Sequence, residues 1–401
     1  MHVEYRDIVS SDVVERYLTA TPDLTADPDQ EAALMFAAIR QEATRCGGRI
    51  CRQRVFVPEG NLEAYLAAWE AITAGEQPDC PGNWLNAGPG AAGGVQAHVL
   101  AGALDWRPLR DDAGRRAGWV LRNGRVRWAV VDGLHLARTG DDERSTRAAL
   151  ATAERLIAQA DMELSDIART WFFLHDILGW YGRFNEGRNH VFRERGLLGS
   201  PGREGVHVPA STGIGAAPAY GSRLAMELIA VAGVEGAIVR RLEAGRQRCA
   251  YQYGSAFARA SEAVTPAGRT VFVSGTAAID REGRTCCVGD AKGQIRMTLQ
   301  NVLAVLSDAG CRPTDAVQAT AYCRTPAVAD LFADAFKNTL PWPWVTVVCD
   351  ICRNDLLFEA EVTAGLPADA GFEARRSAGA CCGTPFRPPD LPCDHQTMET
   401  R

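Results

Sequence analysis

The sequence has no apolar run long enough to cross a bilayer, which excludes a membrane-spanning helix of ordinary length. Its first residues, Met1 to Asp7, lack the basic segment and apolar core of a secretory signal. The formal net charge of −6 is modest, so the composition does not favour nucleic acid or an anionic membrane as the main partner. These absences predict a cytoplasmic protein that binds neither nucleic acid nor membrane.

A disulfide framework is not expected either, because the cysteines number 13, an odd count. Most of them lie in apolar runs, where a reduced thiol such as that of Cys352 acts as a small hydrophobic side chain. A Pro-rich tail holds three cysteines and a histidine without the paired spacing of a structural zinc site: Cys381, Cys382, Cys393 and His395. We therefore expect no metal and no cofactor.

What the sequence does contain is an internal repeat. The segment that starts at Leu150, LATAERLIAQADMELSDIARTWFFL, aligns without gaps with LQNVLAVLSDAGCRPTDAVQATAYC, which starts at Leu299. Each copy has the pattern of an amphipathic helix, a polar turn, a buried strand and a second helix. The flanking segments typical of strands are 126–131, 224–239, 270–273, 345–349 and 356–362.

This order predicts an α+β protein with two tandem modules, each a mixed sheet with two helices on one face. The glycine-rich and serine-containing segment 199–215 is expected to be a loop, whose Ser211 and Thr212 are possible hydrogen-bond donors over a pocket. The expected units are an N-terminal extension that contributes to the first module (1–110), a degenerate first module (111–245), a second module with the principal active-site residues (246–366) and a disordered tail (367–401).

Three motifs follow one another in the second copy: VFVSGTAAIDREG, GDAKGQIRMTLQNVLAVLSDAGCRPTDAVQATAYC and LLFEAEVTAG. In this order they resemble the core of the Rid/YjgF superfamily, whose closing strand carries Glu-x-Glu. The duplication, with YQYGSAFARA before the second copy and CRNDLLFE near its end, is similar to the chorismatase branch. The resemblance implies a chorismate mutase-like fold, and either a homotrimer with pockets at its interfaces or a monomer.

Chorismatases hydrolyse the enolpyruvyl ether of chorismate to pyruvate and a dihydrodiol or hydroxybenzoate. The resemblance therefore implies a cofactor-independent hydrolase or lyase of secondary metabolism, whose substrate is chorismate or a related small cyclohexadiene carboxylate. One alternative is a Rid-like enzyme that acts on an imine, an enamine or another reactive biosynthetic intermediate. The other is a non-catalytic protein that binds a small molecule.

The residue at one position distinguishes the chorismatase-like hydrolase from the Rid-like enzyme that acts on an imine. Simple Rid deaminases hold the substrate carboxylate with an arginine fifteen residues before the first glutamate of the closing strand. In this sequence that residue is Trp344, which argues against imine hydrolysis. An aromatic side chain there is also compatible with a bulky planar substrate.

Glu359 and Glu361 alternate along the closing strand, so they point to the same face of the sheet. A carboxyl group in a partly apolar pocket has a raised pKa, which a general acid at neutral pH requires. Glu359 matches the acid of the family, and the resemblance implies that it protonates the methylene carbon of the enol ether. The alternative is that both glutamates lie on a solvated edge. In the first copy, Glu227 is the candidate counterpart.

A dianionic substrate also requires cations, and guanidinium groups bind carboxylates through two hydrogen bonds. Small residues at 275–277 allow a ligand to approach backbone N–H groups, or else form a β-bulge that the fold requires. Asp290 is expected to cap the following helix. The expected substrate-binding residues, with two of the four arginines lining the pocket, are Arg188, Arg259, Arg324, Arg353, Tyr253, Gly275, Thr276, Ala277, Trp344 and Glu361.

Overall fold

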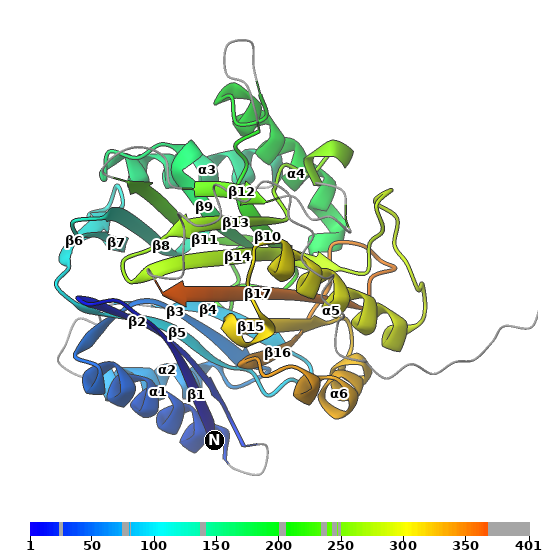
Figure 1. Cartoon of the computed structure of the whole chain (residues 1–401). Coiled ribbons are helices and arrows are strands. Elements are labelled where there is room, and N and C mark those ends of the chain that lie inside the picture. Colours follow the sequence, from blue (N-terminus) through cyan, green and yellow to red (C-terminus); the bar gives the residue numbers. More distant parts are fainter. Residues whose placement is uncertain are drawn as a thin grey trace, which may run out of the picture.

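The computed structural model describes residues 1–23, 27–73, 80, 82–136, 142–199, 206–233, 239–242, 247 and 250–367. Three mixed sheets face one another, and pairs of helices lie on the outside (Figure 1). This arrangement confirms the predicted α+β class, with helices on one face of each sheet. In the described part of the chain, no helix combines the length and hydropathy needed to cross a membrane.

The second and third sheets correspond to the two predicted copies. The second contains β6 (Asp105–Arg110), β7 (Arg116–Arg122), β8 (Val126–Leu136), β9 (Ile167–Leu174), β10 (Ala210–Ile214) and β11 (Leu224–Gly233), with helices α3 (Asp142–Ala158) and α4 (Ile177–Glu194). The third contains β12 (Val239–Leu242), β13 (Ala260–Val264), β14 (Gly268–Ala277), β15 (Ala316–Cys323), β16 (Trp344–Val348) and β17 (Phe358–Pro367), with helices α5 (Ala291–Asp308) and α6 (Pro326–Ala335). Their strand orders are β10-β9-β11-β8-β7-β6 and β12-β13-β14-β17-β15-β16.

The first sheet lies where we expected only an extension of the first module, and this part of the prediction is wrong. Residues 2–102 form β1 (His2–Val9), β2 (Val13–Thr21), β3 (Gly48–Pro58), β4 (Asn83–Gly88) and β5 (Gly94–Gly102), with helices α1 (Pro28–Arg45) and α2 (Leu62–Thr73). The order β1-β2-β5-β3-β4 repeats the plan of the other two sheets. The pattern was hidden because Arg52, Arg54 and Gln96 are buried in β3 and β5, where buried strands usually carry apolar residues.

All three modules place their last strand in the middle of the sheet. β5 lies between β2 and β3, β11 between β8 and β9, and β17 between β14 and β15. The strand before it pairs in parallel with the strand between the two helices, as β10 does with β9. The predicted loop 199–215 is therefore wrong at its end, because Ala210–Ile214 form β10. A short strand of small and polar residues has the composition of a loop.

Each sheet packs its outer face on its own two helices and its inner face on the other sheets. Three hydrophobic clusters fill the sheet–helix layers, and a fourth joins residues of all three modules, among them Tyr17, Trp128, Trp171, Phe272 and Tyr322. Neighbouring modules also contact in a ring, because β10 packs on β14, β16 on β4, and β4 on β8. Polar side chains between the sheets are therefore buried in the centre of the molecule.

The predicted tail begins at the edge of the described chain. Residues 368–401 lie outside the described residues, so the expectation of disorder and the group of Cys381, Cys382, Cys393 and His395 are not tested. Among the described residues, no group of three or more histidine, cysteine or acidic side chains could hold a metal ion.

Candidate functional site

A pocket lies between the second and third modules, at the end of β17 where β10 packs against β14. It holds about 520 Å³ of empty space when its open mouth is counted. Its lining residues are Tyr181, Arg188, Ser211, Gly213, Ser255, Phe257, Arg259, Gly275, Ala277, Ile279, Cys352, Arg353 and Glu359. The predicted acid, small residues and cations therefore meet at one place, although they come from two modules.

Glu359 is the carboxyl group of this pocket. It lies on β17, and only 4% of its surface is exposed. Burial, with a further contribution from the Glu361 carboxylate, raises the pKa of Glu359 to about 8, although Arg259 and Arg169 oppose the rise. At neutral pH this carboxyl group is mostly protonated, so it can donate a proton.

Gly275 provides the space that the Glu359 carboxyl group occupies. A Cβ atom at position 275 would overlap with an oxygen of Glu359 and would also touch Thr212. The pairing of β14 with β17 shifts between Val273 and Thr276, which is the β-bulge that we weighed as the alternative. The backbone N–H of Gly275 donates to the Thr212 hydroxyl at 3.0 Å, so it is not directed at a ligand.

Three of the four candidate arginines line the pocket: Arg188, Arg259 and Arg353. Arg188 comes from α4, and its guanidinium lies over the rings of Phe184 and Phe257. It donates to Asn185 at 2.7 Å but forms no ion pair with a described residue. Burial lowers the pKa of Arg188. A buried cation without a carboxylate partner is costly, and an anionic ligand would compensate it.

Four predicted binding residues lie elsewhere. Arg324 forms an ion pair with Asp350 at 3.0 Å outside the pocket. Trp344 packs in the core of the third module against Phe332 and Trp342, because its side chain points to the helix side of β16. Thr276 is buried and donates to the backbone oxygen of Ser274. None of these three residues lines the pocket.

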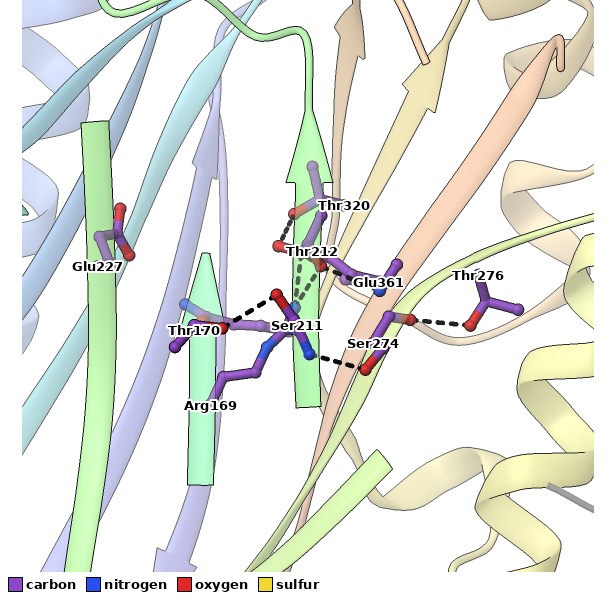
Figure 2. A network of polar contacts seen from close by, with 12 residues as sticks. Arg169, Thr170, Ser211, Thr212, Glu227, Ser274, Thr276, Thr320 and Glu361 are labelled. Atoms are coloured by element: carbon purple, nitrogen blue, oxygen red, sulfur yellow. Dashed lines mark hydrogen bonds and ion pairs between the residues drawn. The ribbon is translucent and has the colours of Figure 1, made fainter. Parts of the chain in front are cut away.

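Glu361 is the fourth of these residues, and it belongs to a neighbouring network. Its carboxylate accepts hydrogen bonds from Thr212 at 2.6 Å and from Arg169 at 2.8 Å (Figure 2). Burial would raise the pKa of Glu361, but Arg169 and Arg54 more than offset this and lower it. Tyr253 ends a 3₁₀ turn, Ala250–Tyr253, and its side chain lies outside the described part.

Several pocket residues were not predicted from the sequence. Tyr181 is one of them, and it lies seven residues before the predicted Arg188 on α4, a spacing that places both on one helix face and could have indicated Tyr181. Cys352 was interpreted as a core residue, but it lines the pocket. Burial raises the pKa of Cys352 to about 12, so its thiol is neutral at physiological pH.

Polar contacts from β10 join the two sides of the pocket. The Ser211 backbone N–H donates to the Ser274 hydroxyl at 2.8 Å, and the Thr170 hydroxyl donates to Ser211 at 3.0 Å (Figure 2). Ser211 and Gly213 line the pocket, while Thr212 points to the other face of the strand and contacts Glu361. The segment that was predicted to be a loop over a pocket therefore forms part of the pocket wall.

The pairing registers identify the counterpart of each glutamate. Glu361 is opposite Thr320, and Glu227 is opposite Trp171, which matches Thr320 in the sequence repeat. Glu227 is thus the counterpart of Glu361. The counterpart of Glu359 is Ala225, so the second module does not carry an acid at this position.

Comparisons with known proteins agree with this architecture. Residues 254–366 match the family model described as Endoribonuclease L-PSP. RutC family proteins of Pyrococcus abyssi and Pyrococcus horikoshii are 28% and 29% identical over 103 and 104 residues, which cover 24% of this chain and 79% and 80% of theirs.

Among solved structures, a chorismatase aligns with a TM-score of 0.57 and 19% identity over 91% of this chain and 98% of that chain. The third module therefore resembles the Rid/YjgF superfamily, and the chain as a whole has the fold of a chorismatase.

Proposed function

We propose that the protein is a chorismatase-like hydrolase that cleaves the enolpyruvyl ether of chorismate or a related cyclohexadiene carboxylate. The observation that carries this proposal is Glu359, a buried carboxyl group with a pKa of about 8 that shares a pocket with three arginines. An acid that stays protonated at neutral pH suits a reaction that begins with proton transfer. Arg188, Arg259 and Arg353 suit a substrate with two carboxylates.

The proposed reaction uses Glu359 as the proton donor and the arginines as the groups that bind the substrate carboxylates. Glu359 donates its proton to the methylene carbon of the enol ether, and the adjacent carbon becomes an oxocarbenium ion. Water adds to that carbon and returns a proton to Glu359. The resulting hemiketal breaks its bond to the ring oxygen, which releases pyruvate and leaves a hydroxyl group on the ring. Arg259, whose charge already lowers the pKa of Glu359, stabilises the carboxylate that forms during the step.

Imine hydrolysis of the simple Rid type is less well supported. The position of its carboxylate-binding arginine is occupied by Trp344, whose side chain is buried in the core of the third module. The carboxylate-binding groups of this pocket come instead from α4 and from the segments that precede β13 and β17.

Incubation of the purified protein with chorismate, with pyruvate as the measured product, tests the proposal. We expect pyruvate release from the wild type and at least about a hundredfold lower turnover from Glu359→Gln, because general acids contribute factors of this order. Absence of pyruvate from the folded wild type would contradict the proposed reaction. Tight binding of chorismate without turnover would instead favour the non-catalytic binding protein.

A matched pair of arginine variants tests the substrate contacts. Arg188→Met should raise KM strongly, because it removes a buried cation that no described carboxylate neutralises. Arg324→Met is the control, because Arg324 lies outside the pocket and pairs with Asp350. Equal kinetics for the two variants would contradict a role of Arg188 in substrate binding.

A further inference from the structure

A second, smaller cavity lies between the three sheets, and the proposed reaction does not use it. About 10 Å³ of it is open to the centre of a water-sized sphere, so the cavity has room for one small ligand. The lining residues are Arg52, Arg54, Gln96, Arg169, Trp171, Gln318, Ala319, Thr320, Glu361, Val362 and Thr363. Neither Glu359 nor any of the three arginines of the larger pocket is among them.

The cavity lies where equivalent positions of the three modules meet. Gln96, Glu227 and Glu361 occupy equivalent positions on the three central strands β5, β11 and β17. Their pairing partners on the adjacent strands β3, β9 and β15 are Arg54, Trp171 and Thr320. Two residues before these partners, on the same three adjacent strands, lie Arg52, Arg169 and Gln318. Three equivalent sets of side chains therefore converge on one point.

Positive charge exceeds negative charge in this cluster. Arg52, Arg54 and Arg169 are nearly fully buried, and they share the two carboxylates of Glu227 and Glu361. Arg54 donates to Glu227 at 2.8 Å and to Glu361 at 2.9 Å. Arg52 contacts Glu227 at 3.3 Å, and Arg169 contacts Glu361 at 2.8 Å. Two carboxylates do not neutralise three guanidinium groups.

Trp171 and Asp132 offer partial compensation for this charge. Each of the three guanidinium groups lies over the ring of Trp171, at 4.5 to 5.0 Å from a ring centroid. Asp132 interacts with Arg52 and Glu227, but burial raises the pKa of Asp132 to about 7, so at neutral pH it carries only part of a charge. Burial, and the repulsion from Arg54 and Arg52, lower the pKa of Arg169 to about 10 although Glu361 opposes this.

Three buried donors of the lining have no partner among the described residues. They are Arg52 Nε, Arg169 Nη1 and Trp171 Nε1. A buried N–H group without an acceptor costs free energy, and such groups in native proteins are normally satisfied by protein, water or an ion. A water molecule accepts two hydrogen bonds and carries no charge, so it would leave one donor and the excess positive charge uncompensated.

We infer that this cavity binds a small monovalent anion of the size of chloride. The anion accepts hydrogen bonds from the unpartnered donors and neutralises the third guanidinium. It stabilises the contact between the three modules and takes no part in proton transfer, so the inference is independent of the proposed function.

The experiment compares thermal unfolding of the full chain in sodium chloride, sodium bromide and sodium gluconate at equal ionic strength. We expect Tm to rise with chloride or bromide to a plateau and to stay lower in gluconate, because a ligand of the native state stabilises it. Crystals grown with bromide should show an anomalous scattering peak in the cavity. Coinciding Tm curves, or crystals without the peak, would overturn the inference in favour of a water site.

Two tryptophan variants separate the site from general salt effects. Trp171→Phe keeps a ring under the arginines but removes one donor, so the chloride concentration for half of the Tm increase should rise about tenfold. Trp344→Phe is the control, because Trp344 Nε1 is also buried and unpartnered but lies in the core of the third module. An unchanged chloride dependence in Trp171→Phe would contradict the assigned donor.

Discussion

At the scale of residues, two glutamates on one strand have opposite properties because their surroundings differ. Glu359 is buried beside a like charge, and its pKa rises to about 8. Glu361 is equally buried, but Arg169 and Arg54 hold it as a carboxylate and lower its pKa. Neighbouring acids with separated pKa values are typical of sites that use one as a proton donor. Sequence alternation predicted their shared face but could not predict this difference, because the arginines come from other modules.

The raised pKa of Glu359 predicts a pH dependence of stability. Between its ordinary pKa, near 4.5, and about 8, the folded state binds more protons at this site than the unfolded state. The contribution of Glu359 to the free energy of unfolding therefore falls as the pH rises through this window. Glu359→Gln should flatten the dependence between pH 5 and 8, as measured by urea unfolding at several pH values. Identical slopes in wild type and variant would contradict the raised pKa.

The overlap at Gly275 predicts a variant that separates activity from stability. In Gly275→Ala, the new methyl group would displace the flexible Glu359 carboxyl group, so turnover should fall about tenfold or more while Tm changes by only a few degrees. Gly182→Ala on α4 is the control, because nothing lies within 4 Å of a Cβ atom there. Full activity of Gly275→Ala would show that the carboxyl group does not need this position.

At the scale of elements, the sequence predicted those strands and helices whose apolar pattern is regular. The second helix predicted for the first copy corresponds to α4, and the predicted strand 270–273 lies within β14. The sequence did not reveal β10 as a strand or residues 2–102 as a module. β10 is short and polar, and β3 and β5 carry charged or amide side chains on their inner face. These side chains are satisfied only by partners from distant segments, which local periodicity cannot indicate.

The N-terminal cap of α5 allows a prediction about stability that does not involve the proposed reaction. The Asp290 side chain accepts a hydrogen bond from the Gly293 backbone N–H and caps α5, as the sequence predicted. Asp290→Ala should lower the free energy of unfolding by about 1 kcal/mol, the usual value of such a cap. Its turnover should equal that of the wild type when measured well below Tm. A large loss of activity would instead assign Asp290 to the reaction.

At the scale of the whole molecule, the three modules pack in a ring within one chain. The strand order repeats three times, and each module contacts the next until the ring closes. The resemblance to the Rid/YjgF superfamily is compatible with either a homotrimer or a monomer. Because the inner faces of all three sheets are already buried against one another, no inner face remains for a second chain to cover.

We therefore expect a monomer in solution. Light scattering coupled to size-exclusion chromatography should give a mass near 43.3 kDa at micromolar concentration. The measurement requires no variant, and a dilution series serves as its control. A stable mass of three chains would contradict the expectation and would require an interface on the outer, helical faces.

The ring contains three junctions, which are the contacts between neighbouring modules, and each junction has its own sequence. In an assembly of identical subunits, every substitution recurs at each junction, so no single junction can specialise. Here Glu359 is matched by Ala225 in the second module and by Gly94 in the first. Titration with a ligand of the larger pocket should therefore give one equivalent per chain, and the other two junctions are free to accumulate changes that serve folding alone.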